Sequence, residues 1–353
     1  MNARPLTAIL IVPTGIGAAI GGYAGDALPV ARALAQVCDR LITHPNVLNG
    51  AQLYWPLPNA SYVEGYGLDQ FAAGHWGLQP VQRNRIGVVL DAAIEPELRD
   101  RHLQAIDAAR ATLGLAIAAV TTTDQPLGVE LQTAASGASW GTIARPDSLL
   151  RAAEALIDRA DAEAIAVVAR FPDELDAQAL ADYRHGQGVD ALAGAEAVIS
   201  HLIVRQFQVP SAHAPALAPL PVDPEVAPRS AAEELGYTFL PCVLAGLSRA
   251  PRFVTADSLQ PSLVSAPTLW SDQVDAMIVP ATACGGSATL SLSQGLVIAV
   301  AANTTALDVS PESLGIKALR VQSYWEAIGV LAAYKAGLDP LMLQAAIAPL
   351  PHL

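Results

Sequence analysis

The chain has 353 residues, of which 52% are hydrophobic and 15% are charged, and its formal net charge is -13 at pH 7. This composition excludes an intrinsically disordered chain. The acidic balance argues against nucleic acid as a partner, because phosphate-backbone binding requires a basic surface. Lysine occurs only at Lys317 and Lys335, so the positive charge comes almost entirely from arginine, which suits bidentate binding of carboxylate or phosphate.

The uncharged stretch at residues 7–25 is a poor membrane span because it contains Pro13 and several glycines. Its apolar part ends at Val12, which is too short for the hydrophobic region of a signal peptide. The cysteines are odd in number and far apart, which indicates a reducing compartment rather than a disulfide framework. We therefore expect a cytoplasmic protein with no membrane partner.

Predicted strands and helices alternate along most of the chain. In chain order they are a strand at 7–12, a helix at 28–38, strands at 40–43 and 85–91, a helix from Glu95, strands at 115–121 and 128–132, a helix at 146–158, a strand at 163–169, helices at 190–206 and 230–235, a strand at 275–280, a helix from Gly286, a strand at 296–301, and helices at 322–336 and from Pro340. This alternation predicts an α/β fold, with a mostly parallel sheet or sheets and helices on both faces.

A proline-rich segment interrupts this pattern between Gln208 and Arg229. Such a composition favours an extended, irregular chain. We predict an N-terminal α/β lobe at 1–207, a proline-rich connection or lid at 208–229, and a C-terminal α/β lobe at 230–353. A single domain is the alternative.

Two glycine-rich turns, within residues 7–22 and 275–290, each follow an apolar strand that ends in proline. Backbone N–H groups at the start of a helix bind small anions, so these turns predict a carboxylate or phosphate ligand. The alternative is that the glycines serve only tight turns and close packing. The predicted ligand-binding residues of the two turns are Thr14, Gly15, Gly17, Gly285, Gly286 and Ser287.

The first turn comes close to a dinucleotide-binding fingerprint but does not match it. Its third glycine comes one residue late, and His44 stands where an acidic residue is expected. We therefore assign no nicotinamide or flavin cofactor. The histidines also lack the spacing of a metal site, and no metal is predicted.

Cys284 and His44 are the candidate catalytic residues. A thiol at a helix N-terminus has a lowered pKa, so Cys284 is a candidate nucleophile or proton-transfer group, unless it is a small buried hydrophobe. His44 follows a predicted strand, where an imidazole can act as acid or base, or simply complete a loop. Two weaker acid–base candidates near strand ends are Glu64 and Asp91.

Further ligand-binding candidates lie in loops after strands, where open α/β sheets bind their ligands. Asn46 follows the second strand beside His44, and Arg170 follows the strand at 163–169. A third small-residue loop carries Ser136 and Ser139. His185 lies in a polar turn, and His213 lies in the proline-rich segment. For Arg170 the alternative is an ordinary surface arginine.

Four stretches also carry a resemblance. They are P-T-G-I-G-A-A-I-G-G-Y-A-G-D-A-L-P, L-I-T-H-P-N-V-L-N-G, G-V-E-L-Q-T-A-A-S-G-A-S-W-G-T-I and P-A-T-A-C-G-G-S-A. The chain resembles, from about residue 7 to about residue 345, an uncharacterised family of cyanobacteria and chloroplasts catalogued as a domain of unknown function (DUF3326). The resemblance implies a soluble protein of oxygenic phototrophs, stromal in a plant homologue, with single-unit architecture. It implies no activity.

The residues support three hypotheses of function. The first is a metabolic enzyme, an isomerase, lyase or hydrolase, that acts on a small anionic substrate through Cys284 and His44. The second is a regulator that binds such a metabolite without transforming it. The third is an assembly factor whose loops bind a partner. The sequence leaves open whether the protein is a homo-oligomer.

Overall fold

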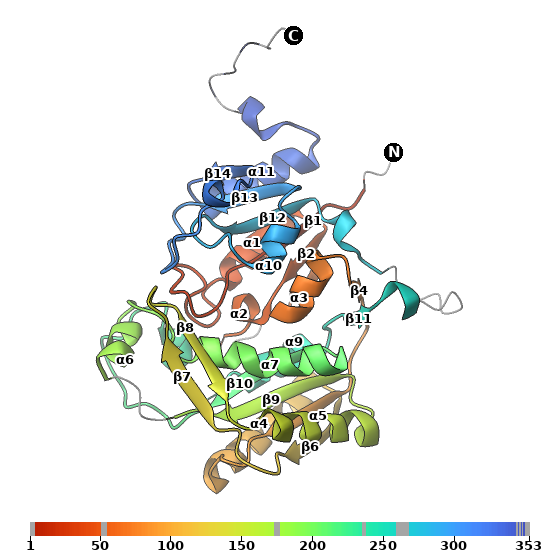
Figure 1. Ribbon diagram of the computed structural model, residues 1–353, viewed down its shortest axis with the longest axis vertical. Coiled ribbons are helices and arrows are strands. Elements are labelled where there is room, and N and C mark those ends of the chain that lie inside the picture. The colour runs from red at the N-terminus through yellow and green to blue at the C-terminus, as the bar shows by residue number, and fades with distance from the viewer. Residues whose placement is uncertain are drawn as a thin grey trace.

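Two parallel β-sheets, each covered by helices, are arranged one above the other along the long axis of the molecule (Figure 1). The computed structural model describes residues 4–50, 55–172, 177–234, 238–258 and 268–343, together with residues 345, 347 and 349. The predicted α/β class with parallel sheets is confirmed. Within these ranges, no helix combines the length and apolar character that a membrane crossing requires.

The upper sheet has six parallel strands, in the order β14-β13-β12-β1-β2-β3. The strands are β1 (Thr7–Leu10), β2 (Arg40–Thr43), β3 (Ala60–Tyr62), β12 (Ala276–Pro280), β13 (Leu296–Val300) and β14 (Ala318–Val321). Ile9 of β1 lies opposite Met277 on one side and Ile42 on the other, so the two ends of the chain share one sheet. The central strands are continuous apolar runs because both of their faces are buried.

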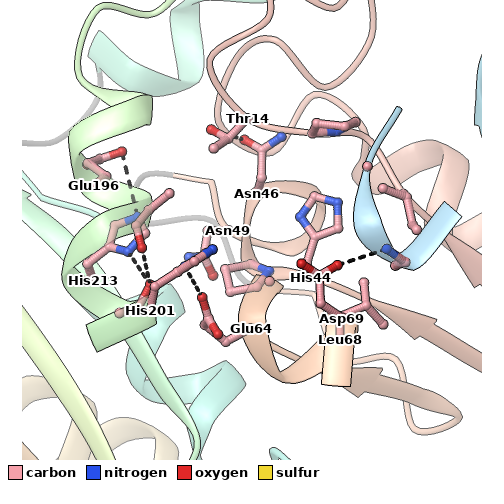
Figure 2. Close-up of a pocket in the computed structure, with 18 of the residues that line it drawn as sticks. Thr14, His44, Asn46, Asn49, Glu64, Leu68, Asp69, Glu196, His201 and His213 are labelled. Carbon is pink, nitrogen blue, oxygen red and sulfur yellow. Dashed lines mark hydrogen bonds and ion pairs between the residues drawn. The ribbon is translucent and has the colours of Figure 1, made fainter. Parts of the chain in front are cut away.

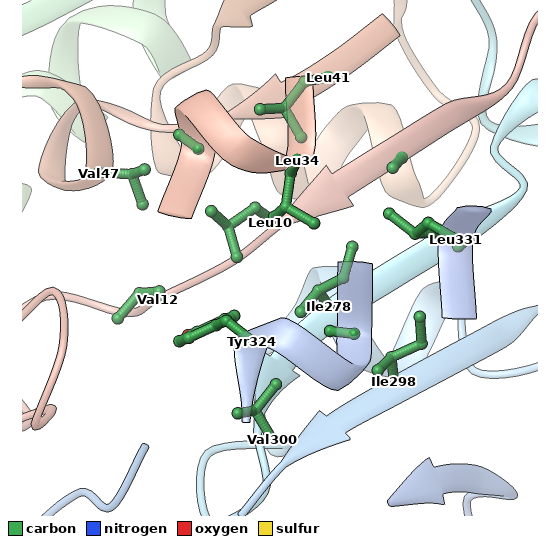
Figure 3. Close-up of a cluster of buried hydrophobic side chains, with 14 of the residues drawn as sticks. Leu10, Val12, Leu34, Leu41, Val47, Ile278, Ile298, Val300, Tyr324 and Leu331 are labelled. Carbon is green, nitrogen blue, oxygen red and sulfur yellow. The ribbon is translucent and has the colours of Figure 1, made fainter. Parts of the chain in front are cut away.

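Alternate residues of these strands enter two different cores. Leu10, Ile278 and Ile298 pack with Leu34 and Leu331 beneath the helices α1 (Leu28–Val37) and α11 (Tyr324–Lys335) (Figure 3). Neighbouring side chains point to opposite faces of a strand, so Ile9 and Met277 pack instead with Phe71 on the face covered by α3 (Gly65–Ala72) and α10 (Ser287–Ser291).

The lower sheet has four parallel strands, in the order β10-β9-β5-β6. The strands are β5 (Ile86–Leu90), β6 (Ile117–Thr122), β9 (Ala164–Arg170) and β10 (Ser211–Ala216). One face packs on α4 (Pro96–Leu113) and α9 (Leu240–Leu247), and the other on α5 (Pro146–Ala160) and α7 (Ala193–Phe207). This sheet and its helices form the lower lobe of the molecule.

The remaining elements connect or extend these two lobes. Two antiparallel pairs are formed by β4 (Gly77–Gln79) with β11 (Arg252–Val254) and by β7 (Val129–Thr133) with β8 (Ser139–Ile143). The short helices are α2 (Pro45–Leu48), α6 (Ala177–Arg184), α8 (Ala231–Glu234) and 3-10 turns at Ala256–Ser258, Ser271–Gln273, Glu312–Leu314 and Pro340–Leu343.

The division between the sheets differs from the predicted boundaries. Residues 208–229 contain β10, which pairs with β9 across six residues, so part of the predicted connection belongs to the lower sheet. The predicted C-terminal lobe is also divided, because α9 packs on the lower sheet while β12–β14 complete the upper one. Composition shows where prolines gather, but it does not show which strand a segment pairs with.

Helix α7 meets the β7–β8 hairpin with almost no space between the backbones. A side chain at Gly194 would overlap the backbone of Ser139 and Trp140, whereas one at the exposed helical Gly329 would meet nothing within 4 Å. This contact fixes the first turn of α7, the helix that carries much of the cavity described below.

We expect Gly194→Ala to lower the free energy of unfolding by about 1–3 kcal/mol, because backbone atoms cannot move aside as a side-chain end would. The matched Gly329→Ala should raise it by about 0.5–1 kcal/mol through helix propensity. Urea unfolding followed by circular dichroism measures both changes. An unchanged Gly194→Ala midpoint would contradict this packing.

Candidate functional site

A cavity of about 400 Å³ lies where the two lobes meet (Figure 2). The upper lobe contributes the loops after β1 and β2, the start of α3 and the start of α10. The lower lobe contributes α7 and β10. Its side chains that carry chemistry are Thr14, His44, Asn46, Asn49, Glu64, Asp69, Asp190, Glu196, Ser200, His201, His213 and Ser287.

His44 is held in one neutral form by the end of the neighbouring strand. Its Nε2 accepts a hydrogen bond of 3.0 Å from the backbone N–H of Val12, which leaves the proton on Nδ1. Burial lowers the pKa of His44 to about 4. At neutral pH His44 is therefore a fixed hydrogen-bond donor, not the titrating acid or base that the sequence suggested.

Asn46 fixes the loop beside His44. Its Nδ2 donates to the carbonyl oxygens of Val12 at 3.0 Å and Gly21 at 2.9 Å, and its Oδ1 accepts from the hydroxyl of Thr14 at 3.5 Å. Pro45 begins the short helix α2, with His44 at its N-cap position. The two loops of the upper lobe are thus joined through one amide side chain.

Glu64 and His201 form an ion pair across the boundary between the lobes. Glu64 caps α3, where its Oε2 accepts from the backbone N–H groups of Tyr66 at 2.8 Å and Gly67 at 3.2 Å. Its Oε1 faces Nδ1 of His201 on α7 (Figure 2). Although burial opposes the charged imidazolium, Glu64 and Asp69 raise the pKa of His201 above its usual value. The Glu64 side chain is 3% exposed and that of His201 is 43% exposed, so the histidine is the accessible partner.

A second histidine and a second carboxyl group lie farther along the same wall. Oγ of Ser200 is 3.1 Å from Nδ1 of His213, and Nε2 of His213 is 3.7 Å from Oε2 of Glu196. Burial lowers the pKa of His213 to about 3, so this imidazole is neutral. Burial, followed by the nearby Asp190 and Glu233, raises the pKa of Glu196 well above its usual value.

The electrostatic character of the cavity is acidic. Four carboxyl groups line it, and none of the described residues of its lining is an arginine or a lysine. Burial raises the pKa of Asp190 to about 6. Burial and the charge of Asp190 raise the pKa of Glu233, just behind the lining, to about 8. Such a site repels an anion unless the carboxyl groups are protonated.

Both glycine-rich turns reach the cavity, through Thr14 and Gly22 on one side and Gly286 and Ser287 on the other. Four amides in or next to these turns are, however, engaged by the protein itself. Gly21 N–H donates to Asp26 at 2.6 Å, Ile20 N–H to Asn303 at 2.8 Å, Ala24 N–H to Glu233 at 2.6 Å, and Ala288 N–H to Asp69 at 2.9 Å. These four amides therefore bind internal carboxyl and amide oxygens, and they are not available to an external anion.

Cys284 does not line the cavity. It is fully buried in the core beneath α3 and α10, and its Sγ lies 3.7 Å from the carbonyl oxygen of Pro280. Burial raises the pKa of this thiol to about 11, which is opposite to the lowered pKa predicted from its position before a helix. The helix that follows has only five residues, so its dipole does not offset burial. The structure does not support a pairing with His44.

Several other candidates take part in packing or in ion pairs away from the cavity. A side chain at Gly15 would overlap Ser139, and one at Gly17 would press on Val189, which supports the turn-and-packing interpretation of both glycines. Ser136 is exposed in the β7–β8 turn, where its Oγ accepts from the N–H of Ala138 at 3.4 Å.

The charged candidates are also engaged elsewhere. Arg170 pairs with Glu95 at 2.9 Å, and His185 lies 3.0 Å from Asp223. Gly285 is exposed beside Val309 and does not line the cavity. The seven predicted site residues that the cavity does gather are Thr14, His44, Asn46, Glu64, His213, Gly286 and Ser287.

Sequence reasoning missed Asp69, Asp190, Glu196 and His201, and it weighted Glu64 and His213 too lightly. One signal was available on α7, where Glu196 and Ser200 are four residues apart on a helix whose other buried positions are mostly apolar. Polar residues at helical spacing on a buried face point to a polar cavity. The ion pair between α3 and α7 joins distant parts of the chain, so no local spacing in the sequence indicates it.

Comparison with known proteins shows which family the chain belongs to. The sequence profile described as "protein of unknown function (DUF3326)" matches residues 7–344. The chain belongs to the DUF3326 family. This DUF3326 protein is 64% identical over 346 residues to a protein of Synechococcus sp. named an uncharacterised lipoprotein, with 97% of this chain and 94% of that protein covered. No solved structure matches it.

We expect Cys284 to resist alkylation in the folded protein, because its thiol is buried and has a pKa of about 11. The measurement is the rate of iodoacetamide labelling at pH 7.5 in a Cys38→Ala, Cys242→Ala variant, with and without denaturing urea. Labelling should be slow until the protein unfolds. Rapid labelling of the native variant would restore Cys284 as a candidate nucleophile.

We expect Glu233→Gln to stabilise the protein more at pH 9 than at pH 5. The folded-state pKa of about 8 exceeds the ordinary value of 4.5, so wild-type stability from the protonated group is complete below 4.5 and is lost as the pH rises through about 8. Glutamine keeps the acceptor for Ala24 N–H and Tyr183 O–H without the charge.

Urea unfolding at the two pH values measures this effect. The advantage of Glu233→Gln over wild type should grow by at least about 1.4 kcal/mol, the value of one pKa unit. The control is Glu154→Gln, the same substitution at an exposed position of α5. Equal effects at both pH values would show that Glu233 is ionised throughout.

Proposed function

We propose that this protein is an enzyme that performs acid–base chemistry on a small polar metabolite bound in the cavity between the lobes. The observation that carries the proposal is the His201–Glu64 pair, in which a half-exposed imidazole faces a buried carboxylate from the other lobe. A histidine oriented by a buried carboxylate is a recurrent arrangement for moving a proton to or from a substrate.

The carboxyl group of Glu64 is held in place, since its Oε2 accepts two backbone hydrogen bonds. The carboxylate in turn supports the protonated form of His201. In this arrangement His201 donates a proton to the substrate, and Glu64 compensates the charge whenever the imidazole takes the proton back. Glu64 is the positioning residue, and His201 is the catalytic residue.

The opposite wall supplies neutral hydrogen-bonding groups. His44 presents Nδ1–H while its Nε2 is occupied, and Asn46 and Asn49 lie beside it (Figure 2). A neutral imidazole with a fixed tautomer polarises a carbonyl or hydroxyl oxygen without transferring its own proton. The volume of about 400 Å³ suits a small metabolite.

The charges of the site favour a neutral or cationic ligand over the anionic substrate that the glycine turns suggested. Isomerase, lyase and hydrolase reactions all use proton transfer, and each remains compatible with this pair. The function is assigned to His201 and Glu64 in place of Cys284, because the thiol is buried away from the cavity. A cytoplasmic location remains a prediction.

The test is turnover by the purified protein of metabolites extracted from cyanobacterial cells, followed by mass spectrometry. Wild type should consume at least one compound and form another. His201→Gln and Glu64→Gln should each slow this turnover by about 100-fold or more, the usual contribution of a general acid or base. His75→Gln, which removes an exposed histidine that contacts Gln70, is the matched control.

The pH profile distinguishes a proton-transfer role from a purely structural one. Loss of the Glu64 charge should lower the pKa of His201, so the limb of the rate profile that reports this histidine should move to lower pH in Glu64→Gln. Stabilisation by a metabolite without turnover would favour the regulator instead. Turnover that survives His201→Gln undiminished would overturn the proposal.

A further inference from the structure

We infer that the ligand of this cavity carries an organic ammonium group, held by Glu196 and Asp190 at the end of the cavity formed by the start of α7. The inference rests on the proposed function and names the chemical class of its substrate. Figure 2 shows Glu196 on the same wall as His213 and His201, facing Thr14 and Asn46 across the cavity.

Glu196 has an oxygen that nothing in the described protein satisfies. The residue is 8% exposed, and its Oε1 is buried without a hydrogen-bond partner. The other oxygen, Oε2, has the neutral His213 at 3.7 Å. A buried carboxyl oxygen without a partner is costly, and because this residue lines the cavity a bound donor would supply the missing hydrogen bond.

Two further carboxyl groups strengthen the negative potential at this end. Asp190 lines the cavity, and its Oδ1 accepts from the N–H of Leu192 at 2.8 Å. Glu233 lies behind the lining and accepts from the N–H of Ala24 and the O–H of Tyr183, each at 2.6 Å. In the described part of the chain, none of the three carboxyl groups forms an ion pair with arginine or lysine.

The nearby arginines are already paired with other carboxylates. Arg184 contacts Glu234 at 2.9 Å, and Arg229 contacts Asp26 at 3.1 Å. These arginines therefore do not neutralise Glu196 and Asp190, and His201 on the same wall is paired with Glu64. A cation from outside the chain would supply the missing positive charge, and without one the carboxyl groups stay protonated. Binding of a cation would ionise the protonated carboxyl groups and pair them with its positive charge.

The geometry favours an ammonium group over a metal ion. Among the residues described, no three histidine, cysteine, aspartate or glutamate side chains are arranged to hold a metal. An ammonium group presents up to three N–H donors and needs only hydrogen-bond acceptors in its reach. Oε1 of Glu196 and the carboxyl group of Asp190 are such acceptors.

The experiment compares three probes of nearly equal size: 2-aminoethanol, ethylene glycol and glycolate, which are cationic, neutral and anionic at pH 7.5. Calorimetry and thermal shift with the full-length protein should show that 2-aminoethanol binds at least about tenfold more tightly than ethylene glycol, and that glycolate does not bind. Titrations in buffers of different ionisation enthalpy should show proton release with 2-aminoethanol, since the cation ionises a carboxyl group.

Glu196→Gln should abolish the preference for 2-aminoethanol and the proton release, while raising the Tm of the ligand-free protein by removing a buried acid. Glu154→Gln, at an exposed position of α5, should change none of these. A structural role alone would predict a lower Tm and an unchanged preference. Equal binding of the three probes, tighter binding of glycolate, or stronger stabilisation by magnesium chloride would overturn the inference.

Failure of this inference can be told apart from failure of the proposed function. Turnover that depends on His201 and acts on a neutral or anionic metabolite would leave the enzyme intact and remove the ammonium assignment. Selective binding of 2-aminoethanol without any turnover of cell metabolites would support the ammonium assignment and remove the enzymatic proposal.

Discussion

The pairing of β1 with β12 is the constraint on which the molecule depends. It joins Thr7 to Asp275, 268 residues later, in the middle of the upper sheet, and the lower lobe is formed by the chain between them. The loops after β1 and β2 and the start of α10 consequently open toward α7 of the lower lobe. The upper lobe lines the cavity with loops and helix ends, where polar groups need not enter the apolar layers, and the lower lobe lines it with α7 and β10.

The cavity concentrates charge that the rest of the core excludes. A protein gains stability by burying apolar area and loses it by burying unpaired carboxyl groups, so Glu196 and Glu233 oppose the folding that positions them. Their pKa values are raised because burial disfavours the ionised carboxylate. Glu64 shows the alternative, since two amides and a histidine surround it. Glu196 differs from Glu64 in lacking a charged partner, and its unpartnered oxygen in the cavity wall is what points to a ligand.

The glycine turns show how one sequence pattern supports two physical outcomes. Free amides after a strand can hold an external anion, or they can be satisfied by side chains from elsewhere in the chain. Here Asp26, Asn303 and Asp69 accept from the amides of Gly21, Ile20 and Ala288, and the positive φ of Gly15 and Gly17 permits the close approach of neighbouring segments. Local spacing predicted that the turns border a cavity. It did not predict their partners, because two of those three lie more than 200 residues away.

The sequence by itself determined the α/β class and most strand positions, because apolar runs of strand length and helical periodicity are local properties. It also placed Thr14, His44 and Asn46 at strand ends, where the cavity lies. Only the tertiary structure decided that Cys284 is buried, that His44 is neutral, and that Glu64 meets His201. Exposure, proton position and charge pairing depend on which distant segments pack together, and a linear pattern carries no record of that packing.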